Sequence, residues 1–166
     1  ESDVDPLRRF LMEKSINSQM KITGVAEQKN SIIRFSNPTI QPCETSPNFV
    51  IASIDIETGA KTNQLYSIAV HITGKNGEHK KVFMIGEKPK RDSELISFYN
   101  DERELLTNFF VWFKQIDPDI IIGWHVIGFD LLFLDNKCRE LGISLDIARA
   151  NGRVSIRQRK PSGHFI

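Results

Sequence analysis

Residues 49–57 read FVIASIDIE, an apolar run that closes on two carboxylates separated by one isoleucine. The run predicts a buried β-strand, and residues i and i+2 of a strand point to the same face. Asp55 and Glu57 are therefore expected to project together from the strand end. Two such carboxylates predict a cation between them, and oxygen-only ligands suit hard ions such as Mg²⁺ or Mn²⁺. The structural alternative is a strand end where both acids simply reach water.

Length and composition indicate about one ordinary globular domain. The chain has 166 residues, of which 40% are hydrophobic and 26% charged, so a packed core is expected. The net charge of +1 gives no general preference for a polyanion. Cys43 and Cys138 lie outside metal-type spacing and predict reduced thiols in a cytoplasmic protein. No apolar run approaches the roughly 20 residues of a membrane span, so no membrane partner is expected.

The sequence divides into a short N-terminal section and a larger section. Residues 1–48 contain a helix-like stretch at 8–17 and strand-like pieces at 20–25 and 32–35. A polar connector follows, marked by Pro38, Pro42 and Pro47. This section is too small to bury much core and is interpreted as the tail of a preceding domain. The absence of an initial methionine before Glu1 also predicts that the sequence is a fragment excised from a longer protein.

The larger section, residues 49–166, has the predicted order β-β-β-α-β-α followed by a hairpin. The expected elements are strands at 49–56, 65–73, 80–85 and 120–123, helices at 101–116 and 131–141, and a hairpin from 153 onward. An Asn-Gly turn separates the second and third strands, and residues 120–123 suit a central parallel strand. A meander joined to an α-β-α unit predicts a mixed α/β sheet flanked by helices. This order is compatible with the ribonuclease-H-like fold.

A further candidate acid lies within residues 120–134, which read IIIGWHVIGFDLLFL. Asp130 follows the apolar run at the expected start of a helix, where an N-cap would be a purely structural role. Trp124 and Phe129 are expected in or near the core, with stacking on an unpaired base as the functional alternative. His125 is either a surface histidine or a contact to a nucleotide strand.

Basic residues cluster near the end of the sequence without an intervening acid: Arg149, Arg153, Arg157, Arg159 and Lys160. Solubility alone explains many such clusters. The functional interpretation is an edge that contacts the phosphates of a single nucleic-acid strand.

The two acidic stretches together resemble the first and second exonuclease motifs of the family B DNA polymerases. SIDIET at 53–58 is similar to the first motif, and DPDIIIGW with GFDLLFL at 117–134 is similar to the second. Residues 6–17 resemble the helix before the exonuclease domain of these enzymes. The sequence of the second motif is most similar to that of one bacterial subgroup of these polymerases. The final hairpin resembles an insertion that this subgroup carries before its third motif. The resemblance covers most of residues 6–143.

The resemblance implies a DnaQ-like, ribonuclease-H-like 3′→5′ exonuclease domain at 49–166, with the tail of a polymerase N-terminal domain at 1–48. The implied activity is proofreading, the two-metal hydrolysis of the 3′-terminal phosphodiester of single-stranded DNA with Mg²⁺ or Mn²⁺. Asp55 would bridge both metals, Glu57 would hold the metal that activates water, and Asp130 would anchor the second.

The implied whole protein is a bacterial, cytoplasmic DNA-directed DNA polymerase. Its implied partners are primer–template DNA and a sliding clamp. The residues expected to contact nucleic acid are His125, Phe129, Arg153, Arg157, Arg159 and Lys160.

Two departures from the family pattern affect this interpretation. His125 stands where the family has asparagine, and an imidazole places its donors and acceptors differently from an amide. The third motif, a tyrosine four residues before an aspartate, is absent, because Tyr66 and Tyr99 precede Val70 and Arg103 at that spacing. The 166 residues by themselves are therefore expected to be inactive or nearly so.

Two alternatives stay open. The first is a non-catalytic DNA-binding or scaffolding module, which the three retained acids argue against. The second takes His125 and Asp130 as the third motif of histidine-type relatives. It requires Asp101 to serve as the second-motif aspartate, and Asp101 lacks the apolar strand that should precede it.

Overall fold

The computed structural model describes residues 4–75, 77–87, 93–149, 154 and 156. The predicted C-terminal hairpin lies outside these residues except for Val154 and Ile156, and so do its four basic residues: Arg153, Arg157, Arg159 and Lys160. Among the described residues, no helix is both long and apolar enough to cross a membrane. Cys43 and Cys138 are free thiols, and burial raises the pKa of Cys138 to about 12.

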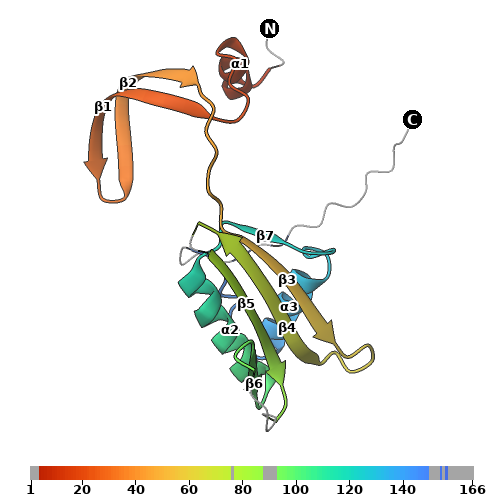
Figure 1. The fold of residues 1–166 in the computed structure, drawn as a ribbon. Helices are drawn as coiled ribbons and strands as arrows, with labels where there is room; N and C mark the ends of the chain where they lie inside the picture. Colours follow the sequence, from red (N-terminus) through yellow and green to blue (C-terminus); the bar gives the residue numbers. More distant parts are fainter. Residues whose placement is uncertain (1–3, 76, 88–92, 150–153, 155, 157–166) are drawn as a thin grey trace. The chain divides into compact units, whose positions relative to one another are not determined.

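The contacts divide the chain into two units, of which the smaller is Glu1–Pro47. It consists of helix α1 (Pro6–Glu13) and an antiparallel hairpin of β1 (Met20–Lys29) and β2 (Ile32–Pro42) (Figure 1). Both strands run further than predicted, and the prediction of a connector at Pro38 and Pro42 is wrong because both lie in β2. Pro38 falls where the register shifts beside Gly24, and a bulge on an edge strand tolerates the missing N–H of proline.

The larger unit, Asn48–Ile166, contains a five-stranded mixed sheet with the order β6-β5-β4-β3-β7 (Figure 1). Its strands are β3 (Ile51–Thr58), β4 (Leu65–Gly74), β5 (Gly77–Ile85), β6 (Ile96–Tyr99) and β7 (Ile120–Ile122). The meander β3-β4-β5 is antiparallel, as predicted, while β7 runs parallel to β3 and β6 parallel to β5. The predicted mixed α/β class is therefore confirmed.

Two features of the sheet differ from the prediction. Strand β6 is absent from the sequence prediction, because four half-buried residues are too few to give a periodic signal. Strand β7 is predicted as central, but in the described sheet it is the edge strand beside β3. Its apolar run suggests burial on both faces, whereas Ile120 and Ile122 are 37% and 48% exposed.

Helices α2 (Glu102–Ile116) and α3 (Asp130–Glu140) lie on one face of the sheet (Figure 1). Asp101 caps α2 by accepting a hydrogen bond from the Glu104 N–H (2.8 Å). The apolar stripe of α2 is buried, as predicted: Leu105, Leu106, Phe109, Phe110 and Phe113.

Strand β3 alternates between a buried face and an exposed face. Ala52, Ile54 and Ile56 are buried in the core. Asp55 and Glu57 lie between and after them, so they point to the opposite face, where both are exposed. The prediction that both acids project from the same face of one strand is confirmed.

Candidate functional site

The second half of β3 extends beyond its partner β7, which pairs only with Ile51–Ser53. The chain leaves β7 at Gly123 and passes directly against the backbone of β3. A Cβ at Gly123 would lie 2.5 Å from the carbonyl oxygen of Ile54. Only glycine permits this approach, which brings the loop after β7 alongside the part of β3 that carries Asp55.

The loop of residues 124–129 is held by backbone hydrogen bonds and by one buried side chain. The Phe129 N–H donates to the His125 carbonyl (2.9 Å), and the Leu131 N–H donates to the Val126 carbonyl (2.8 Å). His125 adopts the left-handed conformation with φ 57°, and its side chain is exposed. Val126 is buried. The loop therefore holds a defined course from the end of β7 into α3.

Asp130 carries a carboxylate that is buried without a hydrogen-bond partner in the described part of the chain. It is 1% exposed, and both its Oδ atoms are unpaired. The N-cap of α3 is Phe129, and α3 has no side-chain cap hydrogen bond. The purely structural N-cap role is therefore wrong for Asp130. Burying an unpaired charge costs free energy, so a counter-charge would stabilise the ionised form of Asp130.

The negative charge of Asp55 contributes to the raised pKa of Asp130. Burial raises the pKa of Asp130 most, and the negative charge of Asp55 raises it further. The N–H groups of Asp130 and Ile56, which lie near the carboxylate without meeting hydrogen-bond geometry, and His125 lower it. The two carboxylates are thus close enough to repel each other. Asp55 and His125 therefore lie within electrostatic range of the Asp130 carboxyl group.

Glu57 does not complete a three-acid cluster. It is exposed on β3, directly before a register irregularity between Glu57 and Thr58. Over the residues that the structure describes, no group of three or more His, Cys, Asp or Glu side chains is placed to hold a metal ion. The donor set fits a hard divalent cation in part, through two neighbouring carboxylates of which one has unsatisfied buried oxygens.

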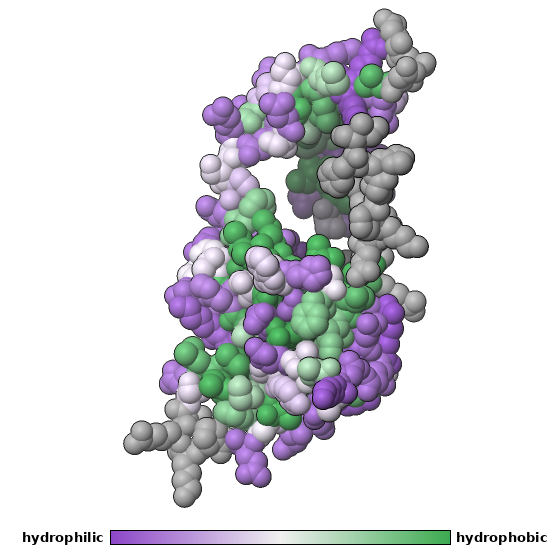
Figure 2. Space-filling view, turned by 90° about the vertical axis from the view of Figure 1, so that its right-hand side faces the viewer, coloured by the Kyte–Doolittle hydropathy of each residue, from purple (hydrophilic) through white to green (hydrophobic). Residues whose placement is uncertain are grey.

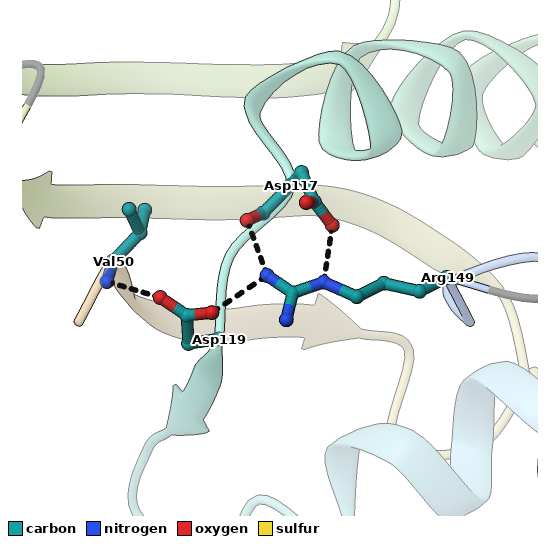
Figure 3. Close-up of polar contacts among 4 residues, drawn as sticks. All are labelled: Val50, Asp117, Asp119 and Arg149. Carbon is teal, nitrogen blue, oxygen red and sulfur yellow. Dashed lines mark hydrogen bonds and ion pairs between the residues drawn. The ribbon is translucent and has the colours of Figure 1, made fainter. Parts of the chain in front are cut away.

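Arg149, the first residue of the basic run, is held in an ion-paired cluster (Figure 3). Its guanidinium donates to Asp117 Oδ1 (2.6 Å), to the Asp117 carbonyl (2.9 Å) and to Asp119 Oδ1 (2.7 Å). Asp119 also accepts from the Val50 N–H (2.8 Å). The cluster fastens the start of β7 to the start of β3. The sequence shows a signal for it in the acids that flank Pro118 before the strand.

Hydrophobic side chains reach the surface of the larger unit (Figure 2). Those in and around loop 124–129 are Ile120, Ile122, Trp124, Ile127 and Phe129. Trp124 is 93% exposed, so the prediction of core packing is wrong for this residue. Phe129 is 47% exposed and lies against Phe133, with ring centroids 6.4 Å apart. The rings of Trp124 and Phe129 are therefore both accessible to a ligand.

Lys137 is a buried cation that the sequence interpretation overlooks. Its side chain is 3% exposed and pairs with Glu102 (3.2 Å) and Glu140 (3.1 Å). The sequence does indicate that Lys137 faces the core, because it follows Asp130 by seven residues and therefore lies on the same face of α3. A lysine at a core-facing position of an amphipathic helix requires acidic partners.

Known proteins match this chain along nearly its whole length. The family model described as the exonuclease domain of DNA polymerase family B matches residues 1–164. DNA polymerase II of Escherichia coli (strain K12) is 32% identical over 162 residues, which cover 95% of this chain and 20% of that protein. The DNA polymerase of Archaeoglobus fulgidus is 26% identical over 161 residues, covering 97% of this chain and 20% of that protein.

The fold also matches a solved structure, that of the family B DNA polymerase from the hyperthermophilic archaeon Pyrobaculum calidifontis. The match has a TM-score of 0.64 at 20% identity and covers 92% of this chain and 20% of that chain. It confirms the predicted fold class, and this chain spans 20% of the length of each of these three relatives. Because the family model covers all but two of its residues, the chain belongs to the exonuclease-domain family of the family B DNA polymerases.

Proposed function

We propose that the chain contributes the 3′→5′ exonuclease of a DNA-directed DNA polymerase and removes the 3′-terminal nucleotide of single-stranded DNA during proofreading. The observation that carries this proposal is the buried, unpartnered carboxylate of Asp130 beside Asp55. A divalent cation is a suitable counter-charge for two neighbouring carboxylates. Family membership favours a nuclease over other cation-dependent roles.

The three acids have distinct proposed roles. Asp55 would hold both cations, Glu57 the cation that activates water, and Asp130 the other. Mg²⁺ or Mn²⁺ would supply Lewis-acid polarisation of the phosphate and a more acidic bound water. Glu57 shares the exposed face of β3 with Asp55, which supports a common site for these two acids.

The surroundings of the acids are proposed to hold DNA. His125 would donate a hydrogen bond to the strand, and the exposed rings of Trp124 and Phe129 would stack on unpaired bases. The basic residues at 153–160 are proposed to contact phosphates. For the whole protein we propose primer–template DNA and a sliding clamp as partners and the bacterial cytoplasm as its location, in line with its two free thiols.

Manganese binding tests the candidate site directly. We expect Mn²⁺ titrated into the 166-residue chain, followed by electron paramagnetic resonance, to bind, and we expect Asp55→Ala to abolish that binding. Asp146→Ala is the matched control, because Asp146 is an exposed acid paired with Lys114. A longer chain that includes a third motif is expected to release mononucleotides from single-stranded DNA with Mg²⁺, whereas residues 1–166 alone release few. Failure of that longer chain to bind Mn²⁺ would refute the proposal.

A non-catalytic DNA-binding module is the second candidate. Two observations favour it: the described residues contain no three-acid cluster, and His125 replaces the usual asparagine. Its signature in the same experiment is single-stranded DNA binding that does not change when Mn²⁺ is added or when Asp55 is replaced. The nuclease proposal predicts the opposite on both counts.

Trp124 provides a direct probe of base stacking. Its indole is 93% exposed, whereas Trp112 packs against Phe83 with centroids 5.6 Å apart. In Trp112→Phe protein, a short oligothymidylate with Mg²⁺ is expected to quench the remaining fluorescence. Trp124→Ala is expected to weaken oligonucleotide binding about fivefold to tenfold, roughly 1 kcal/mol for one stacked base. Val111→Ala, an exposed change on α2, is the control, and unchanged fluorescence with unchanged affinity would exclude stacking.

A further inference from the structure

We propose that Lys137 is a positioning residue for the candidate cation site. Its buried bridge to Glu102 fixes helix α3 along strand β3 and so sets the position of Asp130 relative to Asp55. This inference rests on the proposed function, because it assigns Lys137 a task at the same site. Lys137 lies outside both motif segments and touches neither candidate ligand in any described contact.

The bridge joins three elements through one oxygen atom. Lys137 Nζ lies 3.2 Å from Glu102 Oε1. The same Oε1 accepts a hydrogen bond from the Leu65 N–H at 2.6 Å. Glu102 is in the first turn of α2 and Leu65 is the first residue of β4. Lys137 therefore ties α3 to α2 and to the start of β4.

A second oxygen ties the same lysine to the turn after β3. Lys137 Nζ lies 3.1 Å from Glu140 Oε2, which also accepts from Asn63 Nδ2 at 3.3 Å. Asn63 belongs to the turn closed by the Gly59 N–H donating to the Gln64 carbonyl at 2.8 Å. This turn begins directly after β3, so the bridge holds the strand end that carries Glu57.

Asp130 and Lys137 occupy the two ends of one buried stripe on α3. Asp130, Leu134 and Lys137 are all buried, and the spacing of four and then three residues places them on one face. Seven residues of helix span about 10 Å. Asp130, within electrostatic range of Asp55, lies at one end. Lys137, which reaches the β3–β4 turn through Glu140 and Asn63, lies at the other. Sliding or rotating α3 would therefore disturb both ends together.

An ion pair suits positioning better than it suits stability. Apolar contacts such as those of Leu134 are non-directional, whereas charged hydrogen bonds impose a geometry. A buried ion pair adds little net stability compared with apolar residues of similar size. Burial works to lower the pKa of Lys137, but Glu140 and Glu102 raise it above its usual value, so the lysine is charged. Removing the bridge should therefore change geometry more than stability.

The test compares four variants of the 166-residue chain by Mn²⁺ affinity and by urea unfolding. Lys137→Met removes the charge, and Lys137→Met with Glu102→Gln removes the whole ion pair but keeps an acceptor for the Leu65 N–H. Lys137→Arg restores a cation. Arg139→Gln is the control, because Arg139 is 72% exposed on the same helix.

We expect the double variant to unfold at the wild-type urea concentration but to bind Mn²⁺ about tenfold more weakly, the low end of the range for residues that orient ligands. Lys137→Arg should regain most of the affinity, and Arg139→Gln should match wild type. Wild-type affinity in the double variant, or affinity that falls only in step with stability, would overturn the positioning role. A wild-type chain that does not bind Mn²⁺ in either its short or its extended form would instead remove the proposed function.

Discussion

Asp130→Asn is expected to stabilise the cation-free chain while it eliminates cation binding and DNA hydrolysis. The buried carboxylate has no hydrogen-bond partner in the described structure, and both burial and the charge of Asp55 raise its pKa. A neutral amide of the same size avoids the repulsion, which we expect to add about 1 kcal/mol to the free energy of unfolding at pH 7. A cation, however, loses one of its negatively charged ligands.

The expected loss of hydrolysis is on the order of 10³-fold, because a metal supplies several kcal/mol of transition-state stabilisation and each 1.4 kcal/mol is tenfold in rate. Urea unfolding with EDTA measures the stability, and Mn²⁺ titration and nucleotide release from an extended chain measure the function. Asp146→Asn is the control, because the exposed Asp146 carboxylate pairs with Lys114. This substitution should neither raise the free energy of unfolding nor weaken Mn²⁺ binding and nucleotide release. A variant that is both less stable and still active would contradict the assignment of Asp130.

Gly123→Ala is expected to destabilise the larger unit by about 3 kcal/mol, toward the upper end for forced overpacking. The added methyl carbon would lie 2.5 Å from the carbonyl oxygen of Ile54, and a strand backbone cannot yield as a side chain does. Strand β7 and the loop after it must then move away from β3. We therefore also expect Mn²⁺ affinity to fall, because Asp130 follows that loop.

Gly128→Ala is the matched control for this substitution. Its Cβ would lie 2.6 Å from His125 Nε2, which is the far end of an exposed side chain that can rotate away. We expect a loss of stability well below that of Gly123→Ala when both are measured by chemical denaturation. Equal losses in the two variants would show that the close approach to β3 is not what requires glycine at 123.

The placement of the three acids could be predicted largely from the sequence because it depends on local geometry. The alternation of residues 51–57 determines that Asp55 and Glu57 share a face of β3. Asp130 could be located because an apolar strand followed by an amphipathic helix is a strong local pattern. What the pattern does not reveal is that the Asp130 carboxylate is buried without a partner, since this depends on β3, which lies about 75 residues away in sequence.

Other features depend on partners that no local pattern encodes. Arg149 looks like one member of a basic run, yet Asp117 and Asp119, more than 25 residues earlier, hold its guanidinium. Trp124 carries a large aromatic side chain of the kind that is usually largely buried, yet it is 93% exposed on the loop after β7, which is an edge strand in the described sheet. Lys137 could have been recognised as core-facing from its helical spacing, but not its acidic partners Glu102 and Glu140.

The pairing of β3 with β7 has a consequence for the order of folding. The hydrogen bond between the Val50 N–H and Asp119 links residues 69 positions apart, whereas β3, β4 and β5 follow one another through short turns. Closing a long loop costs chain entropy before its contacts reward it. The meander therefore should form first and the strand-to-helix segment with Asp130 should dock late. The acids are then brought into place only once nearly the whole larger unit has folded.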